Sequence, residues 1–213
     1  MKKIFLILTT VFVCALSLAA CSNAASTFND DFTGLEFTDW GRPNRKVYND
    51  LGELEKDSDL VVIGTFVKNA EQKETYLEEF DKKTLTAVFS TNYIEISKVI
   101  KGDAKAGDTV PVKQNYGVHE NKYVTTSGLT PMIKGDSWLF FLKEERKEEE
   151  PAGTGIYMCV GDSDGRYPLE NFSYKKIALT DNEKLGVFEE YDFRREIYKE
   201  IVDKYDLLSP ANS

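Results

Sequence analysis

The chain has 213 residues, with 36 acidic residues against 27 basic ones and a formal net charge of −9. A negatively charged surface repels the phosphate backbone of nucleic acids and anionic lipid head groups. The composition therefore argues against these anionic partners. The length suffices for one domain with a hydrophobic core.

The first twenty residues have the parts of an export signal. Lys2 and Lys3 form a short basic start, and a nearly continuous apolar run follows over residues 4–18. The run is shorter than the roughly 20 apolar residues that a spanning helix needs, and small residues end it, as in cleaved signals. We therefore predict a signal peptide over residues 1–20, with an uncleaved anchor as the weaker reading.

The signal ends in the tetrad Leu18-Ala19-Ala20-Cys21. This tetrad resembles the lipobox of bacterial lipoproteins, in which an aliphatic residue and two small residues precede a cysteine. The resemblance implies a diacylglyceryl group on the thiol of Cys21, cleavage before Cys21, and frequent acylation of the freed amine. Two or more acyl chains hold a protein stably at a membrane. The expected location is extracytoplasmic and lipid-anchored; cleavage nearby by the general signal peptidase, giving a secreted protein, is the alternative.

Cleavage and lipidation change both the charge and the cysteine content of the mature chain. Removal of Lys2 and Lys3 from the 27 basic residues leaves 25 against 36 acidic residues, a net charge of −11. Cys14 leaves with the signal and Cys21 is alkylated, so Cys159 is left alone and no intramolecular disulfide can form. Cys159 lies in an apolar run, which predicts a buried and inert thiol.

Residues 21–43 are mostly polar and predict a tether, followed by a single domain over residues 44–208. A short helix is expected at the start of this domain. Four apolar residues recur there at helical spacing, namely Val47, Tyr48, Leu51 and Leu54.

The next segments predict β-structure. Residues 59–67 read as a buried strand, and the Lys- and Glu-rich stretch 68–83 as an exposed excursion. In 84–101 the apolar residues change alternation phase between Tyr93 and Ile94. Because side chains alternate strictly along a regular strand, this change predicts a bulge or bend.

Further strands are expected over 109–116 and 134–142, the second apolar enough to be buried on both faces. Pro111 cannot donate a ladder hydrogen bond and predicts a strand edge or end. Residues 143–150 form a charge run typical of a hairpin tip. The remaining expected elements are a strand at 155–161, a turn at 162–165, and an amphipathic helix over about 180–206 whose capping box is Thr180 and Glu183.

The pattern "SDLVVIGTFV … YIEISKVIKGDAKAGDTVPV … GDSWLFFL" is similar to that of a group of exported bacterial proteins. More distantly it resembles the netrin-like modules of tissue inhibitors of metalloproteinases, which are OB-type five-stranded barrels. The resemblance covers roughly residues 47–160 and implies a mainly β fold with flanking helices (α+β), a small OB-like barrel with a C-terminal helix. Those inhibitors chelate zinc through a disulfide-bonded N-terminal cysteine, whereas Cys21 is expected to be alkylated, so this mechanism does not carry over.

The sequence contains few of the residues and motifs that enzymes use for catalysis. His119 is the only histidine, and an exposed loop residue is expected there; no nucleophile-elbow, zinc-protease or paired-cysteine motif occurs. The run 162–170 fails the spacing of a calcium loop. No catalytic residue, metal ligand or cofactor is predicted. Tyr116 and Tyr123 are weak candidates for lining a ligand groove, because OB-type barrels often bind ligands on one face.

We expect a lipid-anchored binding or interaction module with an unknown protein or small molecule as ligand. The main alternative is an extracytoplasmic hydrolase that acts on wall or extracellular polymer with a carboxylate pair. Two facing acids with separated pKa values would favour the hydrolase. A third possibility, a small-ligand carrier, requires an enclosed apolar pocket.

Overall fold

The computed structural model describes residues 32, 34–41, 46–79, 82–126, 128–146, 153–169, 192–205 and 207. The predicted signal peptide, Cys21 and the capping box at Thr180 and Glu183 lie outside these residues. Within the described ranges, no helix combines the length and the apolar character needed to cross a membrane.

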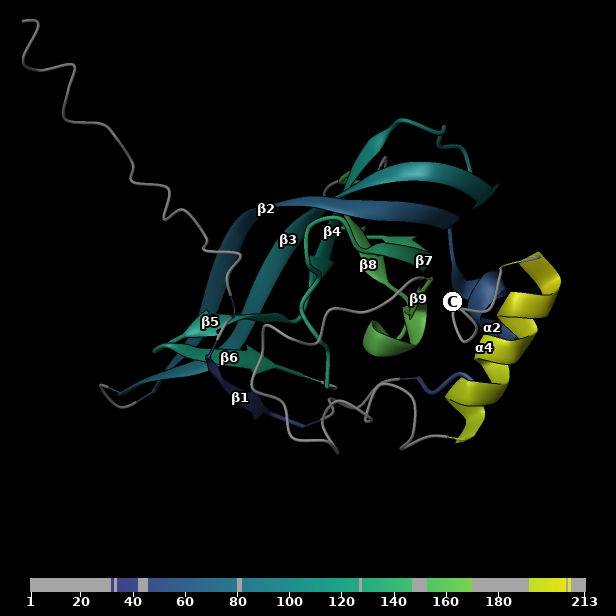
Figure 1. Cartoon of the computed structure of the whole chain (residues 1–213). Helices are drawn as coiled ribbons and strands as arrows, with labels where there is room; N and C mark the ends of the chain where they lie inside the picture. Colours follow the sequence, from purple (N-terminus) through teal and green to yellow (C-terminus); the bar gives the residue numbers. More distant parts are fainter. Residues whose placement is uncertain are drawn as a thin grey trace, which may run out of the picture.

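A closed five-stranded β-barrel forms the centre of the molecule (Figure 1). The strands follow one another around the barrel in the order β2, β3, β4, β8 and β7, and β7 pairs back with β2. The β4–β8 pair is parallel and the other pairs are antiparallel. This arrangement is consistent with an OB-like fold. The strand bounds are Leu60–Glu79 (β2), Lys82–Lys101 (β3), Thr109–Gln114 (β4), Ser137–Glu144 (β7) and Tyr157–Cys159 (β8).

The predicted strand at 134–142 is confirmed as β7, and it is buried on both faces as expected. Trp138 and Phe140 point into the barrel interior, whereas Leu139 and Phe141 pack in a second core outside the barrel. Burial of one such side chain stabilises the fold by about 1.5–3 kcal/mol. The strand therefore joins the two cores.

Two helices cover the second core: α2 (Leu51–Asp57) and α4 (Asp192–Tyr205). The predicted first helix is confirmed, but it begins at Leu51, because the Asp50 side chain accepts a hydrogen bond from the Glu53 amide at 2.8 Å and caps it. Val47 therefore lies outside the helix and is 50% exposed. Of the helix expected over about 180–206, the structure describes α4, with Ile197 and Ile201 fully buried.

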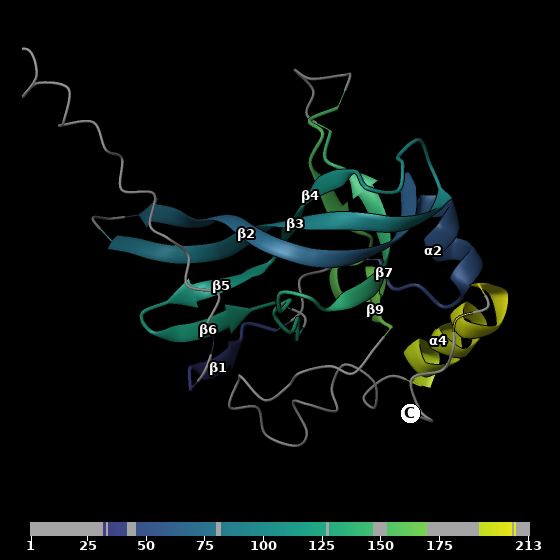
Figure 2. The ribbon, with the colours of Figure 1, turned by 45° about the horizontal axis from the view of Figure 1, so that its top comes forward.

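Strands β2 and β3 are each twenty residues long and continue beyond the barrel as a two-stranded ribbon (Figure 2). The segment 68–83, expected as an exposed excursion, belongs to this ribbon. The predicted irregularity in 84–101 is confirmed: one register shift lies opposite the step from Tyr93 to Ile94, where Val67 is the extra residue on β2. Further shifts lie along the same pair of strands, and their extra residues are Ala70 on β2 and Thr86, Ser97 and Ile100 on β3.

The set of β3 residues that faces inward, however, differs from the predicted set. Its buried residues are Val88, Ser90, Asn92, Ile94 and Ile96, so one alternation phase runs inward through Tyr93 without the predicted change. The prediction used the apolar residues alone. It missed the continuous inward phase because two residues of that phase, Ser90 and Asn92, are polar. Both are buried because they hydrogen-bond a second sheet.

This second sheet, here called the small sheet, has the strand order β1, β6, β5. It lies beyond one end of the barrel, whereas α2 and α4 lie at the opposite end (Figure 1). Glu120 and Asn121 both have positive φ and form the two-residue turn between β5 and β6. Phe32, Tyr116 and Tyr123 fill its core. The strand bounds are Glu36–Asp39 (β1), Tyr116–His119 (β5) and Lys122–Thr125 (β6).

Candidate functional site

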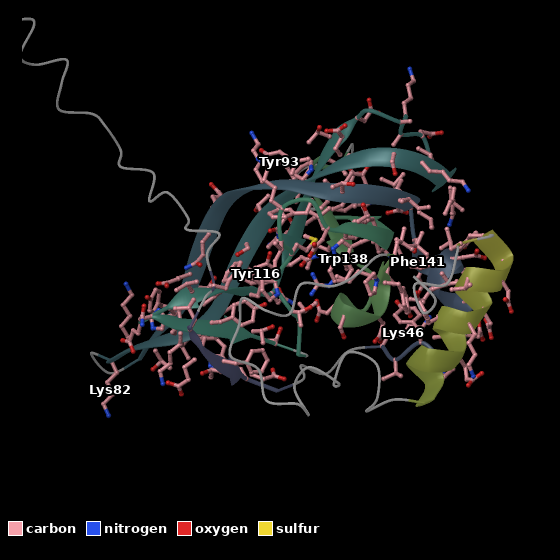
Figure 3. All side chains as sticks on the ribbon, in the orientation of Figure 1. Lys46, Lys82, Tyr93, Tyr116, Trp138 and Phe141 are labelled. Atoms are coloured by element: carbon pink, nitrogen blue, oxygen red, sulfur yellow. The ribbon has the colours of Figure 1, made fainter. Side chains whose placement is uncertain are left out.

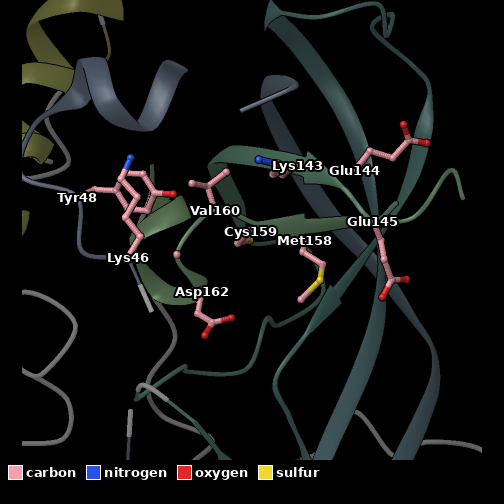
Figure 4. Close-up of a pocket in the computed structure, with 10 residues that line it drawn as sticks. Lys46, Tyr48, Lys143, Glu144, Glu145, Met158, Cys159, Val160 and Asp162 are labelled. Carbon is pink, nitrogen blue, oxygen red and sulfur yellow. The ribbon is translucent and has the colours of Figure 1, made fainter. Parts of the chain in front are cut away.

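An open cleft of about 310 Å³ lies where the β7–β8 hairpin meets the segment before α2 (Figure 4). It is shallow and borders solvent, whereas the barrel interior beside it is filled by packed side chains. The residues that line the cleft are Lys46, Tyr48, Lys143, Glu144, Glu145, Met158, Cys159, Val160, Gly161 and Asp162.

On one side of the cleft, Asp57 hydrogen-bonds two residues of the segment before α2. Its Oδ2 accepts hydrogen bonds from Lys46 Nζ at 2.9 Å and from the Tyr48 hydroxyl at 3.0 Å. The bond from Lys46, and then that from Tyr48, lower the pKa of Asp57. Burial, with the bond to Asp57, raises the pKa of Tyr48 to about 12. Near neutral pH Asp57 is therefore ionised, and Tyr48 keeps its proton.

The carboxylates of the cleft also have partners. Glu145 forms an ion pair with Lys113 at 2.8 Å, Asp162 accepts a hydrogen bond from Asn115 at 2.8 Å, and Glu144 accepts one from the amide of Gly155 at 2.9 Å. Figure 4 shows the side chains of Glu144 and Glu145 leaving the hairpin in opposite directions. The two neighbouring acids therefore do not face each other across the cleft.

Cys159 lies at the boundary between this cleft and the barrel interior. Its predicted burial is confirmed: the residue is 7% exposed, and burial raises the pKa of its thiol to about 12. Gln114 Nε2 lies 3.5 Å from the sulfur and donates to it. A nucleophilic thiol needs a lowered pKa and access to solvent. Cys159 is a packing residue in this structure.

The barrel interior contains a buried arginine that sequence analysis missed. Arg166, on β9 (Arg166–Pro168), stacks over the Trp138 ring at 4.8 Å from its centroid. Its Nη1 donates to Gln114 Oε1 at 2.8 Å, and its Nη2 donates to the carbonyl of Thr130. The only signal in the sequence was an arginine directly after the turn 162–165, which looks like a surface residue.

Tyr116 and Tyr123, the two candidates for a ligand groove, are both fully buried. The hydroxyl of Tyr116 donates to Asn92 Oδ1 at 2.7 Å, and that of Tyr123 donates to the carbonyl of Leu129 at 2.6 Å. Figure 3 shows Tyr116 between the ribbon and the small sheet. Neither ring is exposed to a ligand at the surface, because both serve the core of the small sheet.

His119 lies on β5 and is half-buried, not in an exposed loop as expected. Its Nδ1 lies 2.9 Å from Glu74 Oε1 on the ribbon. The hydrogen bond from the Tyr76 hydroxyl, followed by the one with His119, lowers the pKa of Glu74. Next to this pair, Gln72 both accepts from the amide of Val118 at 2.6 Å and donates to its carbonyl at 2.7 Å.

The segment 162–165, expected as a turn, is a short 3₁₀-helix (η1) that leads into β9. In the described part of the chain, no cluster of three or more histidine, cysteine or acidic side chains has the arrangement of a metal site. No protein-family model matches the sequence, and a search of curated proteins finds no match.

Proposed function

We propose that the protein is an extracytoplasmic lipoprotein, held to the membrane by lipid on Cys21, whose barrel binds a ligand on its outer surface without transforming it. The lipobox resemblance supports the anchor. The closed barrel order, with its single parallel pair between β4 and β8, supports an OB-type fold, a class that uses its surface for binding.

The observation that favours binding over catalysis is that the acids in the cleft of Figure 4 already have partners within the protein. Glu144, Glu145 and Asp162 each accept a hydrogen bond or form an ion pair within the protein. A hydrolase with a carboxylate pair needs one acid with a raised pKa opposite an ionised one. Asp57, which hydrogen-bonds the cleft residues Lys46 and Tyr48, has its pKa lowered. The arrangement suits recognition by a fixed polar surface.

The packed barrel likewise disfavours a carrier that encloses its ligand. Trp138, Phe140 and Val112 occupy the interior and are at most 1% exposed. A ligand of this protein therefore contacts the outer clefts.

Isolated peptidoglycan provides the test that separates binding from hydrolysis. The purified protein is incubated with it, and both co-sedimentation and the release of soluble reducing ends are measured. The proposal expects no release, whether or not the polymer retains the protein. Release that Glu145→Gln or Asp162→Asn abolishes would instead establish the hydrolase.

A further inference from the structure

A second open cleft, here called the helix cleft, lies at the end of the barrel covered by the helices. Its volume is about 520 Å³, within the range of small-molecule sites. Val61 is fully buried in the core beneath it, and Ile100 is half-buried. The residues that line the helix cleft are Gly52, Glu55, Lys56, Val61, Ile100, Lys101, Lys204 and Tyr205.

One acid of the helix cleft is already neutralised. Lys204 Nζ lies 2.7 Å from both carboxylate oxygens of Glu55, and the Tyr205 hydroxyl donates to the same group. Burial opposes ionisation of Glu55, but these hydrogen bonds outweigh it and lower its pKa. Glu55 is therefore ionised, and its charge is balanced by Lys204.

Two further lysines of the helix cleft form no hydrogen bond or ion pair with a carboxylate of the described residues. Lys101 Nζ donates to the carbonyls of Glu55 at 2.6 Å and Ser58 at 2.5 Å, which are neutral acceptors at the end of α2. Lys56 has no hydrogen bond or ion pair to any residue that the structure describes. The helix cleft thus has an excess of two positive charges in a protein whose net charge is −9.

Two acids near the start of α2 accept hydrogen bonds from backbone amides. Asp50 accepts from the amide of Glu53 at 2.8 Å, and Glu200 on α4 accepts from the amide of Leu51 at 3.3 Å. The first bond caps α2 and the second joins α2 to α4. Lys56 and Lys101 remain as the groups that an added anion would meet.

We propose that the helix cleft binds a small organic anion, with its oxyanion on Lys56 and Lys101 and a short aliphatic chain against Ile100, above the buried Val61. The site combines charge-assisted hydrogen-bond donors with an apolar floor, and an inorganic ion would use only the first. A carboxylate and a phosphate monoester share this chemistry. The inference deepens the binding function proposed above by naming a ligand class, and it does not depend on the anchor.

The test is a titration of the intact mature protein, from whichever cell fraction it is purified, with hexanoate and separately with hexyl phosphate. Methyl resonances of Val61 and Ile100 report occupancy of the cleft. Because the site is open to solvent, we expect a dissociation constant on the order of 1 mM. The tighter of the two probes identifies the oxyanion, and hexanol, the neutral control, should bind at least about tenfold more weakly.

Two lysine variants, each of which removes one positive charge, distinguish binding at the helix cleft from a general effect of the protein's charge. Lys56→Gln removes one donor of the cleft and should weaken the anion about tenfold. Lys105→Gln removes an exposed lysine of the turn before β4 and should leave the affinity unchanged. Neither lysine side chain is buried, so both variants should fold.

Three outcomes would overturn the proposal: no shift at Val61 and Ile100, equal binding of hexanol, or equal weakening by both variants. Any of them would leave the peptidoglycan result and the state of Cys21 untouched, so the failure of this site is distinguishable from failure of the proposed function.

Discussion

The barrel and the joint between the ribbon and the small sheet are held by different kinds of contact. In the barrel, apolar side chains such as Phe140 interlock inside a closed ring of backbone hydrogen bonds. At the joint, the edge of β5 meets side chains: Gln72 pairs with the amide and carbonyl of Val118, and Ser90 donates to the carbonyl of Tyr116 at 2.8 Å. The barrel therefore depends on packing, whereas the joint depends in addition on a few directional hydrogen bonds.

The largest expected effect is in the barrel. Phe140→Ala removes a fully buried ring that packs beside Trp138. Loss of burial together with the cavity left behind should lower the free energy of unfolding by about 3–5 kcal/mol. Chemical denaturation of the variant and the wild-type protein measures it. A loss below about 1 kcal/mol would mean that the interior of the barrel is not closely packed.

The next largest effect is expected when the hydrogen bonds of the joint are removed. Gln72→Leu leaves the amide and carbonyl of Val118 without their partners, which should cost about 2 kcal/mol. The control is Lys73→Leu, the neighbouring residue on the opposite, exposed face, which should change stability by less than about 0.5 kcal/mol. Equal effects of the two variants would contradict the described docking of β5.

Close approach at the joint gives a third, somewhat smaller effect. A Cβ on Gly117 would overlap with Val88 Cγ1 and would lie 2.6 Å from Gln72 Oε1. Gly117→Ala should therefore push the ribbon away from β5 and destabilise by about 1–2 kcal/mol. Amide exchange should rise on β5 and β6 and stay unchanged on β7; a rise on all three would show that the joint and the barrel unfold as one unit.

Acid should loosen the joint and the helix end before the barrel. The pKa values of Glu74 and Glu55 are lowered from the ordinary 4.5 by their partners in the fold. Each therefore contributes stability that is complete above about pH 4.5 and is lost as the pH falls through the lower, folded value. Amide exchange between pH 6 and pH 3 should rise first in β5 and α4. A first rise in β7 would contradict this order.

The sequence predicted the parts of the fold that follow from apolar pattern. The doubly buried strand β7 is a continuous apolar run, and the first helix shows helical spacing at Leu51 and Leu54. Buried polar residues were missed because they look like surface residues in a sequence. Ser90 and Asn92 are buried only because the small sheet, far along the chain, supplies hydrogen-bond partners.

The candidate site was less accessible to sequence analysis. The cleft of Figure 4 joins Lys46 and Tyr48 to the β7–β8 hairpin, about a hundred residues away, and no local motif marks that meeting. Tyr116 and Tyr123 were chosen as aromatic residues near a barrel face, but residue type does not distinguish a ligand platform from a core. The helix cleft depends in the same way on the packing of α4 against α2, which brings Lys204 to Glu55.

In the proposed function, lipid on Cys21 holds the binding barrel at a membrane, and the mass of the mature protein tests this proposal most directly. Intact mass spectrometry and membrane fractionation are compared for the wild-type protein and Cys21→Ala. The wild-type chain should begin at Cys21, carry the mass of a diacylglyceryl group, and sediment with membranes; the variant should lack the added mass and leave the membrane. A variant that remains membrane-bound and processed as before would contradict the anchor.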